Sequence, residues 1–495
     1  IKICIKGDFM KVSKLFNGIK ILNKCDLDLD IKEMKKYSKN VEQGDIFFDL
    51  SSSYECGLKN CQEALSNGAV MVVSENRLQL ENLCLVQDSH SAFSSACENY
   101  YDEPSTKMKI IGITGTNGKT TCAHLISEML KGQGKNVGTI GTMGVKFAGQ
   151  DIDYSMTTPD ADDLQRTFYE MQKSGVEYVV MEVSAHAIAQ RRVEGVKFEV
   201  GVLTNITQDH LDYFGTMENY RDCKLSFFTD EYIKSAVVSS DDESGRELLK
   251  NIKVPALSFG LQNPADVFAV KIKGGLDGAE FYGNILDDVY KVKTNLVGEY
   301  NVSNVLASLS VMATLGFDVS KAVESLKTIK PVEGRFNVIK YKGKYIVIDF
   351  AHTPDGLENV LKTAKKICKG KLYCVFGCGG NRDSGKRPKM GAIAEKYSDY
   401  VCVTNDNPRF ENPTKIASDI EKGMRKSHFV ELDRQSAIEK MISLSKKDDV
   451  ILIAGKGGEK YQIVGDKKLD YNDFDAVYKI IKNDVRKEIK EKYGN

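Results

Sequence analysis

The chain has 495 residues, which is too long for one hydrophobic core and indicates about three domains. Apolar residues make up 42% and charged residues 28%, as in ordinary globular proteins, and Lys plus Arg equals Asp plus Glu at 69 each. This balance excludes a global attraction to nucleic acid or to an anionic membrane, so an anionic ligand must be captured by a local site.

The cysteines and the first residues indicate the compartment. Twelve cysteines are scattered along the chain with no Cys-x-x-Cys pair and no zinc spacing, which favours reduced thiols. No apolar run is long enough to span a membrane and no signal peptide is visible, so we expect a cytoplasmic protein without a membrane partner. Met10 resembles a natural start, and residues 1–9 are interpreted as a possible extension.

The first predicted elements occupy residues 10 to 103. Two strand-like runs, GDIFFDL and GAVMVVSE, flank a helical stretch. The segment YYDEPSTKMK that follows is typical of a junction. An N-terminal α/β domain is therefore expected over residues 1–103, counting the possible extension.

After this junction, strand and helix signals alternate. Residues 104–331 contain the apolar runs IIGITG, NVGTIGT, VEYVVMEV, EVGVLTNI and SAVVSS, which predict a largely parallel sheet covered by helices. A second junction, KTIKPVEGRF, precedes KYIVIDF, KLYCVFGCGG, YVCVTND and DDVILIAGKGG. Residues 332–495 are therefore expected to form a third, Rossmann-like α/β domain.

The stretch IIGITGTNGKTTCAHL is typical of a strand, a phosphate-binding loop and a helix. Gly115 and Gly118 let the backbone approach a phosphate, Lys119 would reach the terminal phosphates, and Thr120 would offer a hydroxyl to Mg²⁺. Ile113 stands where the common form of this loop has glycine. The alternative is an ordinary strand-to-helix turn with a surface lysine.

Polar residues follow the ends of several predicted strands, where ligands of open α/β sheets bind. Glu182 follows YVVM and could hold Mg²⁺, and His210 in NITQDHLD could hold a second ion. Taken singly, such a Glu is more often a solvated cap and such a His a core residue. The strand tips of two domains are expected to face each other.

These motifs occur in an order that resembles the Mur ligases, and most of all the members that add the third residue of the peptidoglycan stem peptide. The likeness runs from about residue 108 to 465 and rests on GTNGKTT, TTPD, EVSAHA, TNITQDHLDYFGTMENYRDCK, LVGEYNVSNVLA, GRF, IDFAHTPDGL, FGCGGNRDSGKRP, NDNPRFENP and AGKGGEKYQ. The loop of that family is itself Gly-Thr-Asn-Gly-Lys-Thr-Thr, so Ile113 is no defect.

The resemblance implies an ADP-forming ligase of peptidoglycan precursor synthesis. ATP would phosphorylate the D-glutamate side chain of UDP-N-acetylmuramoyl-L-alanyl-D-glutamate (UDP-MurNAc-L-Ala-D-Glu), and an amine would displace the phosphate. Such chemistry depends on positioning and charge, so Lys119 and Mg²⁺ matter more than a covalent group. The metal ligands implied are Thr120, Glu182, His210 and Lys224 as a carbamate formed with CO₂. Without the resemblance, Lys224 would be interpreted as a surface lysine, because an ammonium cannot bind Mg²⁺.

The resemblance also implies the substrate-binding residues. Asp349 would accept from ribose hydroxyls, and Arg335 would reach a phosphate as the third domain closes. Phe350 stands where the family usually has Tyr. The residues implied for ATP are Gly115, Thr116, Asn117, Gly118, Lys119, Thr120, Thr121, Asn301, Arg335 and Asp349. Those implied for the muramoyl dipeptide are Ser38, Thr157, Thr158, Ser184, Gln190 and Arg192.

The added amino acid is meso-2,6-diaminopimelate or L-lysine in most of the family. Arg409 in NDNPR favours diaminopimelate, because a guanidinium binds the additional carboxylate in a bidentate way. Glu459 would take the distal ammonium, although Gly458 stands where the family often has His. The residues implied are Arg382, Asp406, Asn407, Pro408, Arg409, Gly455 and Glu459. Without the resemblance, Arg409 is an exposed loop arginine.

Some departures leave alternatives open. Residues 50–64 lack the Asp-Gly-His-x-Phe pattern of the UDP-sugar domain, and only Tyr37-Ser38-Lys39 and GDIFF resemble it. The alternatives are an L-lysine-adding ligase, a folylpolyglutamate synthase, a P-loop kinase and a catalytically inactive nucleotide-binding regulatory relative. We expect a monomer with small-molecule substrates and no nucleic-acid partner.

Overall fold

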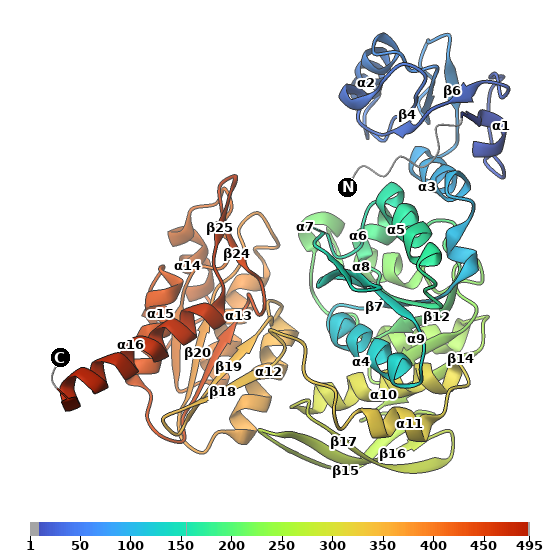
Figure 1. Ribbon diagram of the computed structural model, residues 1–495. Coiled ribbons are helices and arrows are strands. Elements are labelled where there is room, and N and C mark those ends of the chain that lie inside the picture. The colour runs from blue at the N-terminus through green and yellow to red at the C-terminus, as the bar shows by residue number, and fades with distance from the viewer. Residues whose placement is uncertain (1–8, 155, 494–495) are drawn as a thin grey trace.

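The computed structural model describes residues 9–493 except 155, with side chains described as far as residue 486. Residues 1–8, most of the expected extension, lie outside the described residues. Figure 1 shows the chain passing through three main sheets, from the blue N-terminal unit through the green and yellow central unit to the red C-terminal unit. Within the described residues, no helix has the length and apolar character needed to cross a membrane.

The N-terminal unit contains a four-stranded parallel sheet in the order β3-β4-β5-β6. The runs predicted as strands form β4 and β5, and every residue of both is buried. Ser53 and Asp88 cap the two longer helices by accepting from backbone N–H groups. The strands are β1 (Met10–Lys11), β2 (Asp30–Ile31), β3 (Met34–Lys35), β4 (Ile46–Phe48), β5 (Met71–Ser74) and β6 (Leu83–Leu85). The helices are α1 (Val12–Leu15), the 3₁₀ helix η1 (Ser38–Asn40), α2 (Tyr54–Ser66) and α3 (Ser89–Tyr100), with a second 3₁₀ helix, η2 (Pro104–Lys107), next in the chain.

The central unit is built on an eleven-stranded sheet in the order β10-β9-β8-β11-β7-β12-β13-β14-β15-β16-β17. Its middle is parallel, as expected, whereas a hairpin at one end and β15 to β17 at the other are antiparallel. The strands are β7 (Lys109–Thr114), β8 (Val137–Gly141), β9 (Gly144–Phe147), β10 (Gln150–Ile152), β11 (Tyr178–Glu182), β12 (Phe198–Leu203), β13 (Ala236–Ser239), β14 (Ala256–Gly260), β15 (Val267–Gly275), β16 (Gly278–Ile285) and β17 (Asp288–Thr294). The helices are α4 (Lys119–Gly132), α5 (Ala161–Lys173), α6 (Ala185–Ala189), α7 (Leu211–Phe214), α8 (Met217–Leu225), α9 (Glu243–Asn251), α10 (Glu299–Thr314) and α11 (Val319–Ser325).

The register of the central strands brings their ends together. In β11, Glu182 lies opposite Ile113 of β7, and on the other side of β7 Leu203 of β12 lies opposite Thr114. The loops that follow these three parallel strands therefore open at the same edge, which is where ligands of such sheets bind.

The C-terminal unit has a six-stranded sheet in the order β18-β19-β23-β20-β21-β22, and all its neighbours are parallel except β18 with β19. A two-stranded hairpin, β24 with β25, lies outside this sheet. The strands are β18 (Asn337–Tyr341), β19 (Lys344–Asp349), β20 (Leu372–Phe376), β21 (Tyr400–Val403), β22 (Phe429–Val430), β23 (Val450–Ala454), β24 (Tyr461–Val464) and β25 (Lys467–Asp470). The helices are α12 (Pro354–Ile367), α13 (Lys386–Tyr397), α14 (Pro413–Glu421), α15 (Arg434–Leu444) and α16 (Asp473–Tyr493).

Candidate active site

The turn after β7 has the shape that an anion-binding loop needs. Gly115 and Gly118 have φ of 143° and 90°, which glycine adopts without strain. A Cβ on Gly115 would stand 1.9 Å from Oγ1 of Thr204, so no side chain fits there. Gly118 directly precedes α4, whose first N–H groups have no acceptor inside the helix. The turn can therefore receive an anion at the positive end of α4.

The loop after β12 is hydrogen-bonded to this turn. The N–H of Thr116 donates to the carbonyl of Asn205 at 2.8 Å, and the N–H of Asn117 donates to Oδ1 of Asn205 at 2.9 Å. Nδ2 of Asn117 donates to Asp355 of the C-terminal unit at 2.9 Å. Since the fold uses these two N–H groups, the first turn of α4, from Lys119 to Thr121, remains to meet the anion.

Two lysines converge on the loop. Nζ of Lys119 and Nζ of Lys224 donate to the same carbonyl, that of Gly115, at 2.8 and 3.0 Å. Lys224 is only 1% exposed, so it is not the surface lysine that the residue type alone would indicate. Burial, followed by the charge of Lys119, holds the pKa of Lys224 well below its usual range. Burial also lowers the pKa of Lys119, although Glu182 and Asp209 oppose this. Among the described residues neither lysine is in an ion pair, and two amino groups at one carbonyl favour an incoming anion.

Glu182 ends β11 and is 2% exposed, so it is not a solvated cap. Its carboxylate accepts from the N–H and the hydroxyl of Thr142, at 2.9 and 3.2 Å, and from the hydroxyl of Thr120 at 3.1 Å. In the described part of the chain no ion pair reaches Glu182. A buried carboxylate with only neutral donors is suited to a cation, and carboxylate with hydroxyl oxygen is the donor set that Mg²⁺ prefers.

His210 begins α7 with a left-handed backbone, at φ 56°. Its Nε2 lies 3.3 Å from Oδ2 of Asp209, and its ring meets that of His186 edge-on at 4.7 Å between centroids. Burial lowers its pKa to about 3, against the opposing charge of Asp209, so the ring is neutral near pH 7 and able to bind a metal. Among the described residues, however, no group of three His, Cys, Asp or Glu side chains is arranged as a complete metal site.

The residues expected for the nucleotide lie beside this edge. Nη2 of Arg335 donates to the hydroxyl of Thr120 at 3.2 Å, and its guanidinium stacks 4.3 Å from the ring centre of Phe350. Burial raises the pKa of Asp349, although Arg335 opposes this. The Asp349 carboxylate accepts from the N–H groups of Phe336 and Ala351 at 2.8 and 2.7 Å, so it also shapes the loop that carries Arg335.

Asn301 lies on α10 and is buried. Its Nδ2 donates to the carbonyl of Val297 at 2.8 Å, and its Oδ1 accepts from Asn304 at 3.0 Å. Asn304 in turn lies against the loop, because a Cβ on Gly118 would stand 2.6 Å from its Oδ1. Asn301 therefore positions a neighbour of the loop in the structure.

Apart from Ser38, the residues expected for the muramoyl dipeptide form one network of contacts with Glu182. The hydroxyl of Thr158 donates to the Glu182 carbonyl at 2.9 Å and accepts from the N–H of Ser184 at 3.1 Å. Ser184 caps α6 by accepting from the N–H of Ala187. The loop that follows β11 is thereby fixed to the loop that carries Thr158.

Arg192 completes this group. Its Nη1 donates to the carbonyl of Thr158 at 3.0 Å, and its Nη2 donates to Oε1 of Gln190. Its Nε lies 3.2 Å from Oδ1 of Asp160. The hydroxyl of Thr157 lies 3.3 Å from that of Thr142, which contacts Glu182. The hydroxyl, amide and guanidinium set is therefore assembled on the same strand edge as Glu182.

In the C-terminal unit, Asn407 joins two parts of the amino-acid set. Its Oδ1 accepts from Nζ of Lys456 at 2.9 Å and from the N–H of Ile463 at 3.0 Å, and its Nδ2 donates to Glu459 at 3.1 Å. Nζ of Lys456 also donates to Glu459 at 2.9 Å. Glu459 is thus held in place by an internal ammonium.

Arg409 is half-buried and has φ 52°, so it is not an exposed loop arginine. Its Nη1 donates to the carbonyl of Gly380 at 2.9 Å, and its N–H donates to the carbonyl of Ile463 at 3.0 Å. Burial, followed by the charge of exposed Arg382, lowers its pKa. The two guanidiniums therefore make a local positive field suited to a carboxylate.

Glycines let the remaining members of this set approach each other. Gly455 has φ 117°, and a Cβ there would stand 2.8 Å from Oδ2 of Asp406. A Cβ on Gly380 would stand 1.9 Å from the carbonyl of Pro408. The structure thus brings all seven expected amino-acid residues to one region of three loops, after β20, β21 and β23.

The comparisons with known proteins agree on one family. The Mur ligase middle domain matches residues 113–312, and the Mur ligase glutamate ligase domain matches residues 334–457. The chain belongs to the Mur ligase family. It is 38% identical to UDP-N-acetylmuramoyl-L-alanyl-D-glutamate--2,6-diaminopimelate ligase 1 of Clostridium acetobutylicum, over 96% of this chain and 99% of that one.

Two further Mur ligases extend this likeness. The chain is 40% identical to the 2,6-diaminopimelate ligase of the same name from Halalkalibacterium halodurans, over 90% of this chain and 93% of that one. It also aligns with a solved structure of a UDP-N-acetylmuramoyl-L-alanyl-D-glutamate--2,6-diaminopimelate ligase at a TM-score of 0.70 and 31% identity, covering 97% of this chain and 100% of that one.

In the N-terminal unit, Ser38 is the residue expected to contact the muramoyl dipeptide. Ser38 is buried, and its hydroxyl donates to the carboxylate of Glu63 at 2.5 Å. Nδ2 of Asn67 donates to the Ser38 carbonyl at 3.0 Å. Ser38 lies far along the chain from the other expected substrate residues, and within the described residues no hydrogen bond or ion pair joins it to them.

Several residues at this edge were not predicted from the sequence. Asn205 contacts the glycine-rich loop, Thr142 contacts Glu182, and Asp209 contacts His210. Lys386 of the C-terminal unit contacts Asp209. Their signal was weak because each is an ordinary polar residue after a strand. All four stand inside stretches quoted above, and the position of Asn205 and Asp209 in the loop after β12 could have identified them.

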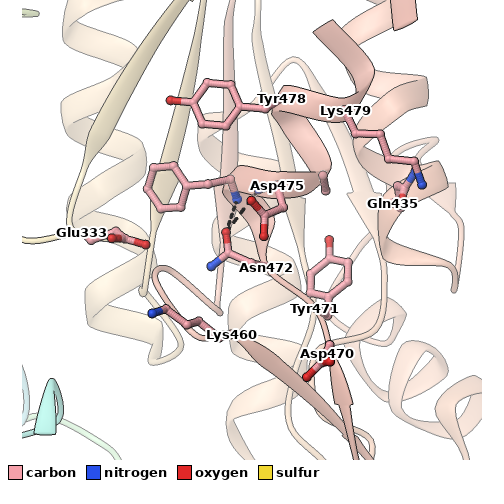
Figure 2. Close-up of a pocket in the computed structure, with 11 residues that line it drawn as sticks. Glu333, Gln435, Lys460, Asp470, Tyr471, Asn472, Asp475, Tyr478 and Lys479 are labelled. Atoms are coloured by element: carbon pink, nitrogen blue, oxygen red, sulfur yellow. Dashed lines mark hydrogen bonds between the residues drawn. The ribbon is translucent and has the colours of Figure 1, made fainter. Parts of the chain in front are cut away.

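A hollow in the C-terminal unit lies away from these residues. Figure 2 shows side chains of α16 and of the segments flanking the β24–β25 hairpin around it, with Glu333 on the opposite side. Its volume is about 900 Å³, and none of the expected site residues lines it. Oδ1 of Asn472 accepts from the N–H groups of Phe474 and Asp475 there, which caps the start of α16.

Proposed function

We propose that this Mur ligase uses ATP to join meso-2,6-diaminopimelate to UDP-MurNAc-L-Ala-D-Glu, the two substrates that the names of its relatives give for those enzymes as UDP-N-acetylmuramoyl-L-alanyl-D-glutamate and 2,6-diaminopimelate. A side-chain oxygen of D-glutamate attacks the γ-phosphorus, giving an acyl phosphate and ADP. The diaminopimelate amine then attacks the acyl carbon, loses a proton and expels phosphate. The product is an amide in a cytoplasmic step of peptidoglycan precursor synthesis.

The observation that carries this proposal is the convergence of Nζ of Lys119 and Nζ of the buried Lys224 on the Gly115 carbonyl. Lys119 stands at the positive end of α4, where it stabilises the negative charge of the phosphoryl group that passes from ATP to the acceptor oxygen. Arg335 contributes a second positive group from the linker to the C-terminal unit. The site is thus preorganised for phosphoryl transfer between two oxygens.

The residues present fit Mg²⁺. Glu182 is a buried carboxylate that is in no ion pair among the described residues, and the hydroxyl of Thr120 contacts it. We infer that these two hold one ion and that His210 holds another, which would supply charge neutralisation for the phosphates. Glu182 orients Thr142 and Thr120 around that position, and the neutral ring of His210 presents a lone pair.

Lys224 supports the metal site as a carbamate. Its lowered pKa favours the neutral amine that adds to CO₂, forming an N–C bond and releasing a proton. The carbamate replaces a buried positive charge beside Lys119 with a negative one, which removes a repulsion and adds a metal ligand. Burial within the fold, at 1% exposure, keeps competing water away.

Arg409 and Arg382 are proposed to bind the distal carboxylate, and Glu459 the distal ammonium. Arg409 is oriented in advance by the Gly380 carbonyl, and Glu459 by Asn407 and Lys456. The remaining assignments follow the motifs, with ATP at the loop, Asn301, Arg335 and Asp349. We further propose the boundaries 1–103, 104–331 and 332–495 for UDP-sugar, ATP and amino-acid domains, in a monomer.

The test offers the purified protein ATP, Mg²⁺ and UDP-MurNAc-L-Ala-D-Glu with diaminopimelate or L-lysine in parallel, and reads product mass. We expect ADP release and an amide product with diaminopimelate. Product with lysine alone would overturn the specificity, and ADP without an amide would indicate a kinase. An inactive regulatory relative would bind ATP and release no phosphate.

A further inference from the structure

Asp209 lies where the central and C-terminal units meet, and the proposed function gives it no task. Its side chain is 7% exposed. Oδ1 lies 3.2 Å from Nζ of Lys386, and Oδ2 lies 3.6 Å from Nε2 of His352, both in the C-terminal unit. Oδ2 also lies 3.3 Å from Nε2 of His210. One carboxylate therefore contacts a loop and the first residue of α13 in the C-terminal unit, and a proposed metal ligand of the central unit.

Lys386 depends on this carboxylate. It is the first residue of α13, and its side chain is 6% exposed. The positive end of the helix dipole disfavours a cation there, and a buried cation without a partner is costly. Within the described residues, Asp209 is the only carboxylate in an ion pair with Lys386. Moving the two units apart would therefore leave both charges without their partner.

The residue before Asp209 makes a second tie to the same C-terminal loop. Nε2 of Gln208 donates to Oδ2 of Asp383 at 3.0 Å, and Nζ of Lys389 donates to Oε1 of Gln208 at 2.5 Å. Asp383 directly follows Arg382, which we place at the amino-acid carboxylate. The two residues that precede His210 thus hold the loop that carries an amino-acid-binding arginine.

We propose that Asp209 is a positioning residue: its ion pair with Lys386 ties closure of the C-terminal unit to the placement of the His210 ring. This rests on the proposed function. An amino acid bound near Arg382 stabilises the closed arrangement, and the closed arrangement holds the Asp209 carboxylate against His210. Amino-acid binding and metal binding are therefore coupled, and each strengthens the other.

The test replaces Asp209 with Asn, which keeps the shape and removes the charge. The matched control is Asp212→Asn, an exposed aspartate in the first turn of α7. We expect Asp209→Asn to lower kcat/KM for diaminopimelate about 30-fold, as the loss of one partner of a buried charge pair does. The Mg²⁺ concentration for half-maximal rate should rise as well, and Asp209→Glu should recover part of both. The control should stay within about twofold.

Two measurements separate this role from general damage. In a double-mutant cycle with Lys386→Met, the double variant should be no worse than the poorer single variant, whereas losses that multiply would overturn the pairing. Small-angle X-ray scattering of the ligand-free protein should give a larger radius of gyration for Asp209→Asn than for Asp212→Asn. Equal radii together with an unchanged Mg²⁺ requirement would overturn the proposal.

Failure of the proposed function would look different. If the wild type forms no amide with any amino acid, the ligase assignment fails, and scattering alone then decides whether Asp209 joins the two units. If the wild type is active and Asp209→Asn matches it in kcat/KM and in Mg²⁺ requirement, the ligase assignment stands and the positioning role is wrong.

Discussion

Replacing Arg409 with lysine tests how the amino acid is selected, because lysine keeps the charge and loses the planar fork. The structure holds the Arg409 guanidinium in place before any ligand arrives, through Nη1 on the carbonyl of Gly380 and the N–H on the carbonyl of Ile463. A carboxylate bound by this fork would lose one of two charged hydrogen bonds in Arg409→Lys.

Such a bond contributes about 1.5–3 kcal/mol, which corresponds to a fall of roughly 10-fold to 150-fold in kcat/KM for diaminopimelate. L-Lysine has no distal carboxylate, so its much slower reaction should change by less than about twofold. The assay measures ADP release together with product mass for both amino acids. Arg425→Lys, at an exposed arginine, is the control.

The decisive quantity is the ratio of the two kcat/KM values. A fall with diaminopimelate alone supports a bidentate contact to the distal carboxylate. Equal falls with both amino acids would place Arg409 elsewhere, and an unchanged rate with diaminopimelate would refute its role.

Three further changes test other parts of the structure. Lys224→Ala should abolish turnover while ATP still binds, as followed by ADP release and by nucleotide titration; turnover near the wild-type rate would contradict its metal role. Burial raises the pKa of Glu98 to about 7, so the native state holds a proton that the unfolded chain has lost, and stability falls as pH rises from about 5 to 7.5. Glu98→Gln should flatten this slope in Tm against pH, and an identical slope would refute it. Arg434→Met breaks a fully buried pair with Asp473 and should cost about 3–5 kcal/mol in urea unfolding, whereas Lys327→Met at an exposed pair should cost under about 1 kcal/mol; equal costs would contradict this.

Local sequence signals predicted much of the fold. The apolar, β-branched runs became β4, β5, β7, β11, β12, β19, β20, β21 and β23, because each is buried on both faces of a parallel sheet. The antiparallel strands β15 to β17 were not predicted. In β15 exposed Phe268 and Val270 alternate with buried Val267 and Ala269, so apolar residues occupy both faces and the usual alternation disappears.

The candidate site was predictable only where a motif marks it. Lys224 illustrates the limit, because a lysine in a helix after a polar loop has no signal of burial, and only the family resemblance marked it. The residues that contact the site residues are brought there by the register of the strands and by contacts between the central and C-terminal units. Glu182 meets Thr142 because β8 and β7 flank β11, and Asp209 meets Lys386 across 177 positions of chain.

The transfer of oxygen from substrate to phosphate tests the central claim most directly. The substrate is UDP-MurNAc-L-Ala-D-Glu that carries ¹⁸O in the D-glutamate side-chain carboxylate. It is incubated with ATP, Mg²⁺ and diaminopimelate, and the mass of the released phosphate is measured by mass spectrometry. Activation as an acyl phosphate predicts one ¹⁸O in the phosphate for each amide formed. Amide formation with unlabelled phosphate would contradict the account.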